Sequence, residues 1–211
     1  MKVLIGVFAV SVVLAFSSTS RASITNAWWW DDYDGAIVCS NATWNPATDA
    51  LSMTGDQYWG PAHMVGTVDT TGPEDPTLTL ANDIENDTNF AWTSYIVNVY
   101  MSNTFTLANV TPLIPGDWTV ASTTEPSSPL PSGPYTGEYE ASFTLVDGTP
   151  VTPGNDIAFQ YQLSFSGASH FAFTEEVIPV PEPAAFQFAA LGGLLLAPLA
   201  FARRRRRAPK A

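Results

Sequence analysis

An acidic segment near the amino end of the chain carries side chains suited to binding a cation. Asp32, Asp34 and Gly35 fit the third, fifth and sixth places of the D-x-[DN]-x-[DN]-G calcium loop. The first place falls on Trp30, which offers no ligand oxygen, and the twelfth falls on Asn41, where that loop needs a Glu. The sequence therefore excludes an EF-hand and leaves two hypotheses: a looser Ca²⁺ site on Asp32 and Asp34, or a solvated acidic loop.

A second acidic pattern lies further along the chain, where Asp83, Glu85 and Asp87 alternate with uncharged residues. On a strand the three carboxylates would share one face and repel one another, and a bound cation would relieve that repulsion. In a loop they would be solvated. Both alternatives stay open, and these residues are a second candidate Ca²⁺ site.

Tryptophan is the residue that could contact a glycan. Three adjacent tryptophans cannot all point inward from one strand, so at least one of Trp28, Trp29 and Trp30 should face solvent, a strand edge or a partner. An exposed indole ring can stack on a sugar ring. The candidate glycan contacts are therefore Trp28, Trp29, Trp30 and Trp59.

Residues for catalysis are sparse. The chain has only two histidines, His63 and His170, and no G-x-S-x-G nucleophile motif. Its single cysteine, Cys39, is predicted to be a buried small hydrophobic residue, because no Lys or Arg lies near it in the sequence to lower its pKa. These features predict a protein that is not an enzyme. A glycosidase with paired carboxylates is the less favoured alternative.

Charge is divided sharply along the chain. The 20 acidic residues all lie between Asp31 and Glu182, and that stretch contains no Lys or Arg. The eight basic residues are Lys2, Arg21, Arg203, Arg204, Arg205, Arg206, Arg207 and Lys210. An acidic domain without basic residues should repel nucleic acid and attract cations.

The central stretch, residues 23–179, is predicted to fold as one all-β domain. Short β-branched and aromatic runs alternate with Pro, Gly, Asn and Ser, and helix signals are nearly absent. Ala158–Phe165 and Tyr95–Met101 have the strict alternation of half-buried strands. About ten such runs indicate an antiparallel β-sandwich, Greek-key or jelly-roll-like. The Pro- and Ser-rich stretch Thr111–Pro134 is predicted to be a long loop.

The first 22 residues have the features of a secretory signal peptide, which forms a helix before its removal. Lys2 supplies a positive start, Val3–Phe16 is almost wholly apolar, and Ser20 and Ala22 are small residues at a cleavage site. The sequence therefore predicts export of the domain.

The carboxyl end combines an apolar run with a basic cluster. Residues 184–202 carry no charge, and 19 residues are just enough for one transmembrane helix. The cluster Arg203–Arg207 follows at once and is predicted to be a stop-transfer signal, which keeps the carboxyl terminus in the cytoplasm.

Before this run stands Pro181-Glu182-Pro183, and the order of the three parts within residues 180–211 resembles a PEP-CTERM sorting signal. Such signals are read by exosortases, membrane-embedded cysteine transpeptidase-like enzymes. The resemblance implies that Pro181, Glu182 and Pro183 are the recognition element and that the tail is removed near them. The segment Asn86–Tyr95 is also similar to one in exported proteins of this class. A plain membrane anchor is the alternative.

Together these features predict an exported, non-enzymatic protein of the cell surface or extracellular matrix. Its expected partners are an exosortase, an extracellular polysaccharide and, before processing, the membrane; nucleic acid is excluded. A carbohydrate-binding module that uses exposed tryptophans is the alternative. The precursor is expected to cross the inner membrane, and the mature form to reside at the cell surface or outside the cell.

Overall fold

A computed structural model describes residues 22–72 and 74–182 of the 211-residue chain. Residues 1–21 of the predicted signal peptide, Pro183, the apolar run 184–202 and the arginine cluster lie outside the described residues. The described part is all-β, as the sequence predicts. Within it, no helix is long and apolar enough to cross a membrane.

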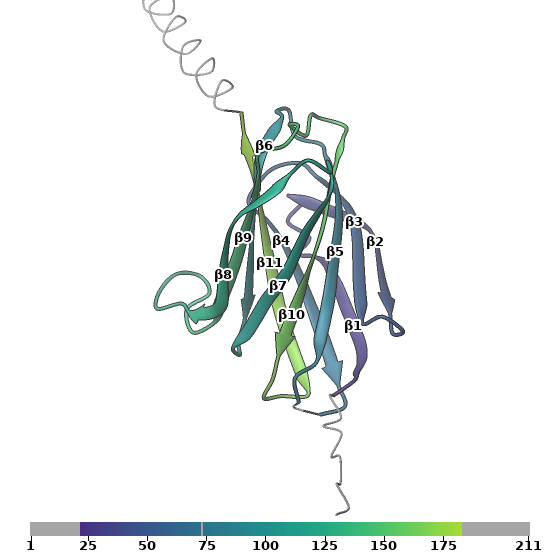
Figure 1. Cartoon of the computed structure of the whole chain (residues 1–211), viewed down its shortest axis with the longest axis vertical. Helices are drawn as coiled ribbons and strands as arrows, with labels where there is room; N and C mark the ends of the chain where they lie inside the picture. The colour runs from purple at the N-terminus through teal and green to yellow at the C-terminus, as the bar shows by residue number, and fades with distance from the viewer. Residues whose placement is uncertain (1–21, 73, 183–211) are drawn as a thin grey trace, which may run out of the picture.

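Eleven strands make up the domain (Figure 1). They are β1 (Ile24–Asp31), β2 (Ile37–Asn45), β3 (Ala50–Gln57), β4 (Ala62–Thr70), β5 (Thr77–Asn86), β6 (Trp92–Met101), β7 (Phe105–Ile114), β8 (Thr119–Pro129), β9 (Tyr139–Val146), β10 (Asp156–Phe165) and β11 (His170–Pro181).

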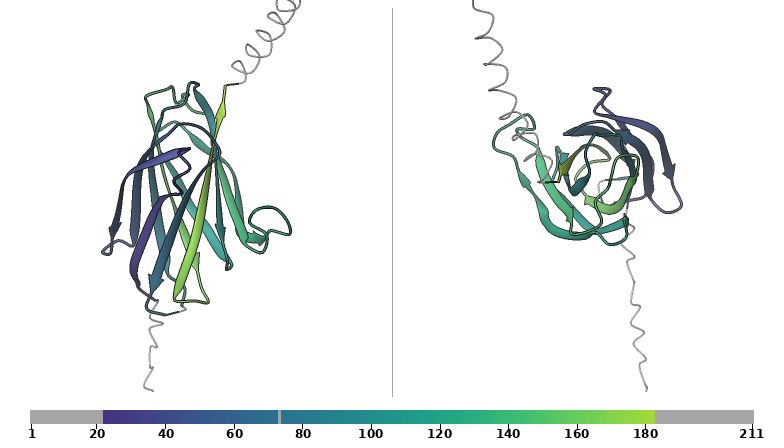
Figure 2. Two further views of the ribbon diagram at one scale, coloured as in Figure 1. Left: turned by 180° about the vertical axis from the view of Figure 1, so that it is seen from behind. Right: turned by 90° about the horizontal axis from the view of Figure 1, so that it is seen from above.

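The strands form two sheets that pack as a sandwich (Figure 2). Sheet A has the order β1-β4-β11-β6-β9-β8, and sheet B has the order β2-β3-β5-β10-β7. All neighbouring strands are antiparallel except β3 and β5, which run parallel. The chain enters this sandwich at one end and leaves it after β11 at the opposite end (Figure 1).

Alternating side chains fill the space between the sheets. The predicted inward faces of β10 and β6 are confirmed, since each of these side chains is at most 3% exposed: Phe159, Tyr161, Leu163, Phe165, Tyr95, Val97, Val99 and Met101. The ring of Phe143 packs against those of Phe159 and Tyr161, with centroids 5.7 and 5.2 Å away. Burying such aromatic rings is the main source of stability for a sandwich of this size.

The prediction of a long loop over Thr111–Pro134 is wrong in large part. Strand β7 continues to Ile114, and β8 occupies Thr119–Pro129. Proline is tolerated in β8 because this strand forms the edge of sheet A, pairs with β9 only and contains register shifts. The irregular parts are the short turn 115–118 between β7 and β8 and the segment 130–138 between β8 and β9.

Candidate functional site

Polar side chains gather on the outer face of sheet A. His63 on β4 lies directly across from Glu176 on β11, which lies directly across from Asn98 on β6. Side chains of directly opposed residues lie on the same face of a sheet. The register therefore brings together three polar residues that are far apart in the sequence.

Glu176 is the centre of this group. The amide of Asn98 donates to its Oε2 at 2.8 Å, and the hydroxyl of Tyr100 donates to the same oxygen at 2.9 Å. Nε2 of His63 lies 3.3 Å from Oε1. Partial burial, and then the hydrogen bond to Glu176, raise the pKa of the Tyr100 hydroxyl, so it acts as a hydrogen-bond donor.

The other ring nitrogen of His63 faces the acidic segment after β1. Its Nδ1 lies 3.7 Å from Oδ2 of Asp32. Asp32, Asp34 and His63 each offer one ligand atom, and these atoms lie within 4.8 Å of one another. The two predicted Asp residues thus come together, with a histidine that the sequence did not associate with them.

The aspartates of this segment also fold it. Oδ1 of Asp32 accepts from the backbone N–H of Asp34 at 3.1 Å, and Oδ1 of Asp34 accepts from that of Ala36 at 2.7 Å. Gly35 adopts a φ of 83°, which favours glycine. Each carboxylate therefore uses one oxygen in the turn, and the second oxygen of Asp32 faces His63.

Asp31 has a different role from its two acidic neighbours. It is buried, and its oxygens accept from the backbone N–H of Tyr33 at 3.0 Å and of Cys39 at 2.8 Å. Cys39 is buried as predicted, and burial raises the pKa of its thiol to about 12. The thiol is therefore protonated and unreactive at neutral pH.

Tyr135, from the segment between β8 and β9, borders the group on Glu176. Its ring stacks on that of Tyr100, with centroids 4.1 Å apart, and lies 6.5 Å from the ring of His63. Burial, and then the charge of Glu176, raise the pKa of Tyr135. The site is thus a part-buried polar patch with an aromatic border.

The second predicted acidic site lies on sheet B. Asp83 and Glu85 are on β5, so the strand alternative holds for them, while Asp87 follows the strand. Glu85 lies across from Asp156 on β10 and from Asp56 on β3. Desolvation, and then the charges of Asp87, Asp56 and Asp156, raise the pKa of Glu85. This row is repulsive, and its ligand atoms do not converge within the described residues as those of Asp32, Asp34 and His63 do.

The predicted glycan contacts separate into exposed and buried rings. Trp28 is 46% exposed and Trp59 is 52% exposed, and Trp30 is partly buried on the same face of β1 as Trp28. Trp29 is fully buried and packs against Phe173, so its assignment as a surface contact is wrong. The reason is the alternation of β1, which turns the middle ring of the three inward.

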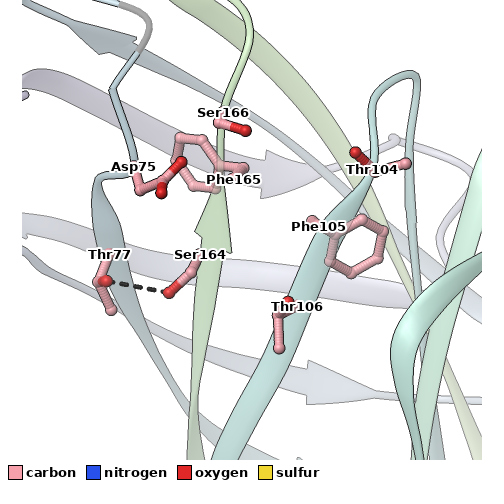
Figure 3. Close-up of a pocket in the computed structure, with 8 residues that line it drawn as sticks. All are labelled: Asp75, Thr77, Thr104, Phe105, Thr106, Ser164, Phe165 and Ser166. Carbon is pink, nitrogen blue, oxygen red and sulfur yellow. Dashed lines mark hydrogen bonds between the residues drawn. The ribbon is translucent and has the colours of Figure 1, made fainter.

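A cavity of about 450 Å³ opens between the start of β5, the end of β10 and the start of β7. Thr77, Ser164 and Thr106 lie across from one another on these three strands. The hydroxyls of Thr77 and Ser164 are 2.9 Å apart (Figure 3). Asp75 supplies the one charge among the lining residues. The cavity presents hydrogen-bonding hydroxyls without a histidine or a cysteine.

Sequence reasoning missed an ionisable residue in the core. Glu175 on β11 is fully buried, and Nδ2 of Asn82 donates to its Oε1 at 3.1 Å. Burial raises the pKa of Glu175 to about 8, so the side chain is protonated at neutral pH. The alternation of Phe171, Phe173, Glu175 and Val177 was a signal that could have found it, since it places Glu175 in an apolar series.

The start of the Pro-Glu-Pro motif belongs to the folded domain. Pro181 is the last residue of β11 and pairs with Trp92 at the start of β6. The backbone N–H of Glu182 donates to the carbonyl of Ala91 at 3.2 Å. The folded domain therefore extends to within one residue of Pro183.

Known proteins offer no guide to these sites. No model of a protein family matches the chain significantly, and neither does any curated protein or solved structure.

Proposed function

We propose that this protein is an exported, non-enzymatic component of the cell surface or extracellular matrix that an exosortase sorts and cleaves. The mature part would be the acidic sandwich, released or attached outside the cell. Its setting would be an extracellular polysaccharide layer. In the precursor, the apolar run 184–202 would hold the chain in the membrane with the arginine cluster inside.

The observation that carries this proposal is the position of the motif at the end of β11. Pro181 and Glu182 still make contacts with the domain, at Trp92 and Ala91. Cleavage next to the motif would remove the apolar run and the arginine cluster and leave every described strand in the product. The resemblance of residues 180–211 to a sorting signal and the signal-peptide features of the first 22 residues support the same route.

Cation bridging is the mechanism we infer for retention in the matrix. The stretch from Asp31 to Glu182 has 20 acidic residues and no Lys or Arg, so its two histidines are the only basic side chains within it that can pair with carboxylates. Divalent cations, Ca²⁺ among them, would link these carboxylates to an acidic polysaccharide. If millimolar Ca²⁺ changes neither thermal stability nor retention on such a polymer, this mechanism is wrong.

The test of sorting is the intact mass of the protein recovered from its own cells. We expect a mass that begins near Ser23 and ends near Pro183, with any attached sugar added to it. A mass that retains Ala184–Ala211 would leave a plain membrane anchor and overturn the exosortase assignment. Intact mass is the right measurement, because trypsin finds no Lys or Arg within the mature domain.

A carbohydrate-binding module is the second candidate, and the exposure of Trp28 and Trp59 favours it. In that case Trp28→Ala and Trp59→Ala would reduce retention on polysaccharide without unfolding the domain. Trp92→Ala is the contrasting variant, because Trp92 is fully buried and its loss would destabilise the fold. Unchanged retention in both surface variants would dismiss this candidate.

The order of the strands also indicates which class of β-sandwich the domain belongs to. Among the described strands, only β2–β3 and β8–β9 are consecutive strands paired with each other, and the other eight connections all cross between the sheets. Such crossings are typical of Greek-key and jelly-roll sandwiches. We therefore assign the sandwich to that class.

A further inference from the structure

We propose that Asp32, Asp34 and His63 form a binding site for a divalent transition-metal ion such as Zn²⁺ or Cu²⁺. This inference deepens the proposed function, because it gives one cation site of the domain an ion class different from Ca²⁺. It rests on the proposed function only for the biological role of the ion.

The orientation of His63 is the first argument. Nε2 of His63 lies 3.3 Å from Oε1 of Glu176. A carboxylate accepts hydrogen bonds, so Nε2 carries a proton, and Nδ1 presents a lone pair whenever the ring is neutral. A metal-binding histidine commonly has its second nitrogen fixed by a carboxylate in this way. Glu176 is itself held by Asn98 and Tyr100, so the ring has a fixed support.

The atoms that Nδ1 faces are the second argument. Oδ2 of Asp32 is 3.7 Å away, beyond hydrogen-bonding distance, and both atoms are acceptors when the ring is neutral. Such an arrangement is repulsive unless a proton on Nδ1 or a cation lies between the two atoms. Two ligands on one Zn²⁺, each at roughly 2.0–2.2 Å from the ion, are about 3–4 Å apart. The observed separation matches that spacing.

The net charge of the three side chains and their access to solvent also favour a bound metal ion. The ligand atom of Asp34 lies within 4.8 Å of the other two, so a small shift completes a three-ligand set. Two carboxylates and a neutral imidazole balance the charge of a divalent ion. The side chains of His63 and Asp32 are 23% and 30% exposed, which leaves the site open to solvent for entry of the ion and for bound water.

The ligand set decides the class of ion. Ca²⁺ and Mg²⁺ prefer oxygen ligands throughout, whereas imidazole suits Zn²⁺, Cu²⁺ and Ni²⁺. The acidic row of Asp83, Glu85 and Asp87 has no histidine, so it lacks this selectivity. The two acidic regions of the domain would therefore differ in the ions they take.

The experiment uses the full-length chain in detergent, stripped with a chelator and titrated with ZnCl₂ at neutral pH by calorimetry. We expect one equivalent of Zn²⁺ to bind, and His63→Gln to weaken the binding by about tenfold or more. Asp34→Asn should also weaken it, while its side-chain oxygen still accepts from Ala36. His170→Gln is the matched control, since His170 also pairs with an aspartate, Asp69, but has no second carboxylate near it in the described contacts.

Electron paramagnetic resonance of bound Cu²⁺ gives a second readout that folding alone would not change. Nitrogen hyperfine splitting should be present in the wild type and in His170→Gln, and absent in His63→Gln. Equal Zn²⁺ affinity in His63→Gln and the wild type would overturn the proposal. The absence of Zn²⁺ binding at millimolar concentration would also overturn the proposal. In that case a proton on Nδ1 of His63 would be the partner of Asp32. Neither result would alter the intact mass that tests the proposed function.

Discussion

Glu175 and Glu176 are neighbours on β11, yet the two sides of sheet A give them opposite environments. Glu175 points into the core, is fully buried, and has a pKa raised to about 8. Glu176 points outward and accepts hydrogen bonds from Asn98 and Tyr100 beside His63. The chemistry of an acidic residue in this protein therefore depends on the face of the strand that carries it.

Two pairs of polar side chains on the inner faces form hydrogen bonds between the sheets. Glu175 on sheet A meets Asn82 on sheet B, and the hydroxyl of Tyr95 donates to Oε1 of Gln57 at 2.5 Å. The outer face instead keeps a carboxylate, an imidazole and hydroxyls near solvent, where they remain available to a ligand. We therefore expect the buried acid to affect stability, and the part-buried acid of the outer face to affect ion binding.

The largest expected effect that tests this contrast is the pH dependence that Glu175 gives to the unfolding free energy of the domain. The pKa of a glutamate is ordinarily about 4.5 and that of Glu175 is raised to about 8 in the fold, so this side chain is most stabilising at low pH, where it is protonated in both states. That contribution falls as pH rises from about 4.5 to 8, by roughly 5 kcal/mol at about 1.4 kcal/mol per pH unit. Glu175→Gln should remove this fall, as measured by urea unfolding between pH 5 and pH 9.

Glu176→Gln is the control for that measurement, since it changes the acid on the outer face. Its unfolding free energy should keep the pH dependence of the wild type. If Glu175→Gln and the wild type lose stability in parallel as pH rises, the buried acid is not the source of the effect.

A smaller effect is expected for Tyr95→Phe, which removes a hydroxyl from the inner face. Gln57 is fully buried, so its Oε1 would lose a hydrogen-bond donor. An unsatisfied buried polar atom costs about 1–3 kcal/mol of unfolding free energy. Tyr33→Phe is the exposed comparison and should change it by less than about 0.5 kcal/mol. Equal losses in the two variants would contradict the assigned role of the buried hydroxyl.

On the outer face, Glu176→Gln should change ligand binding more than stability. Loss of the carboxylate that orients His63 is expected to weaken Zn²⁺ binding by about tenfold. The unfolding free energy should change by about 1 kcal/mol or less, because the group is part-exposed. Calorimetric titration and urea unfolding of the same sample separate the two effects. If Glu176→Gln strongly lowered the unfolding free energy and left the Zn²⁺ affinity unchanged, Glu176 would have a structural role and not a role in orienting His63.

The smallest effect is expected for His170→Gln. His170 lies 2.6 Å from Asp69, but both side chains are well exposed, at 63% and 44%. The hydrogen bond from His170 lowers the pKa of Asp69, so this pair stabilises the fold at neutral pH and loses its effect in acid. Solvent screening makes that contribution weak. The thermal midpoint at neutral pH should stay within experimental error of the wild type, and a clear drop would contradict this.

Much of the fold follows from local patterns that the sequence displays. Alternation in Ala158–Phe165 and Tyr95–Met101 correctly predicted which side chains enter the core. The stretch Thr111–Pro134 was mistaken for a loop, because its prolines lie in or next to an edge strand that only the assembled sheet defines. The grouping of His63 with Asp32 and Glu176 was also hidden, since a sequence does not give the register between distant strands.

The sequence by itself determined three properties of this protein. It set the period of two that makes strands, the confinement of Lys and Arg to the ends of the chain, and the apolar run with its arginine cluster after Pro-Glu-Pro. Each of these depends only on residue type and local order, because side-chain periodicity and charge do not require knowledge of distant contacts.

Only the tertiary structure decided which distant residues meet. The pairing of β4 with β11 placed His63 beside Glu176, which lies 113 residues away, and the packing of the sheets buried Glu175 against Asn82. A shift of one residue in the register of β11 would exchange the faces of Glu175 and Glu176. Burial of the whole apolar series on one face holds that register, and so fixes which acid is buried against Asn82 and which lies beside His63.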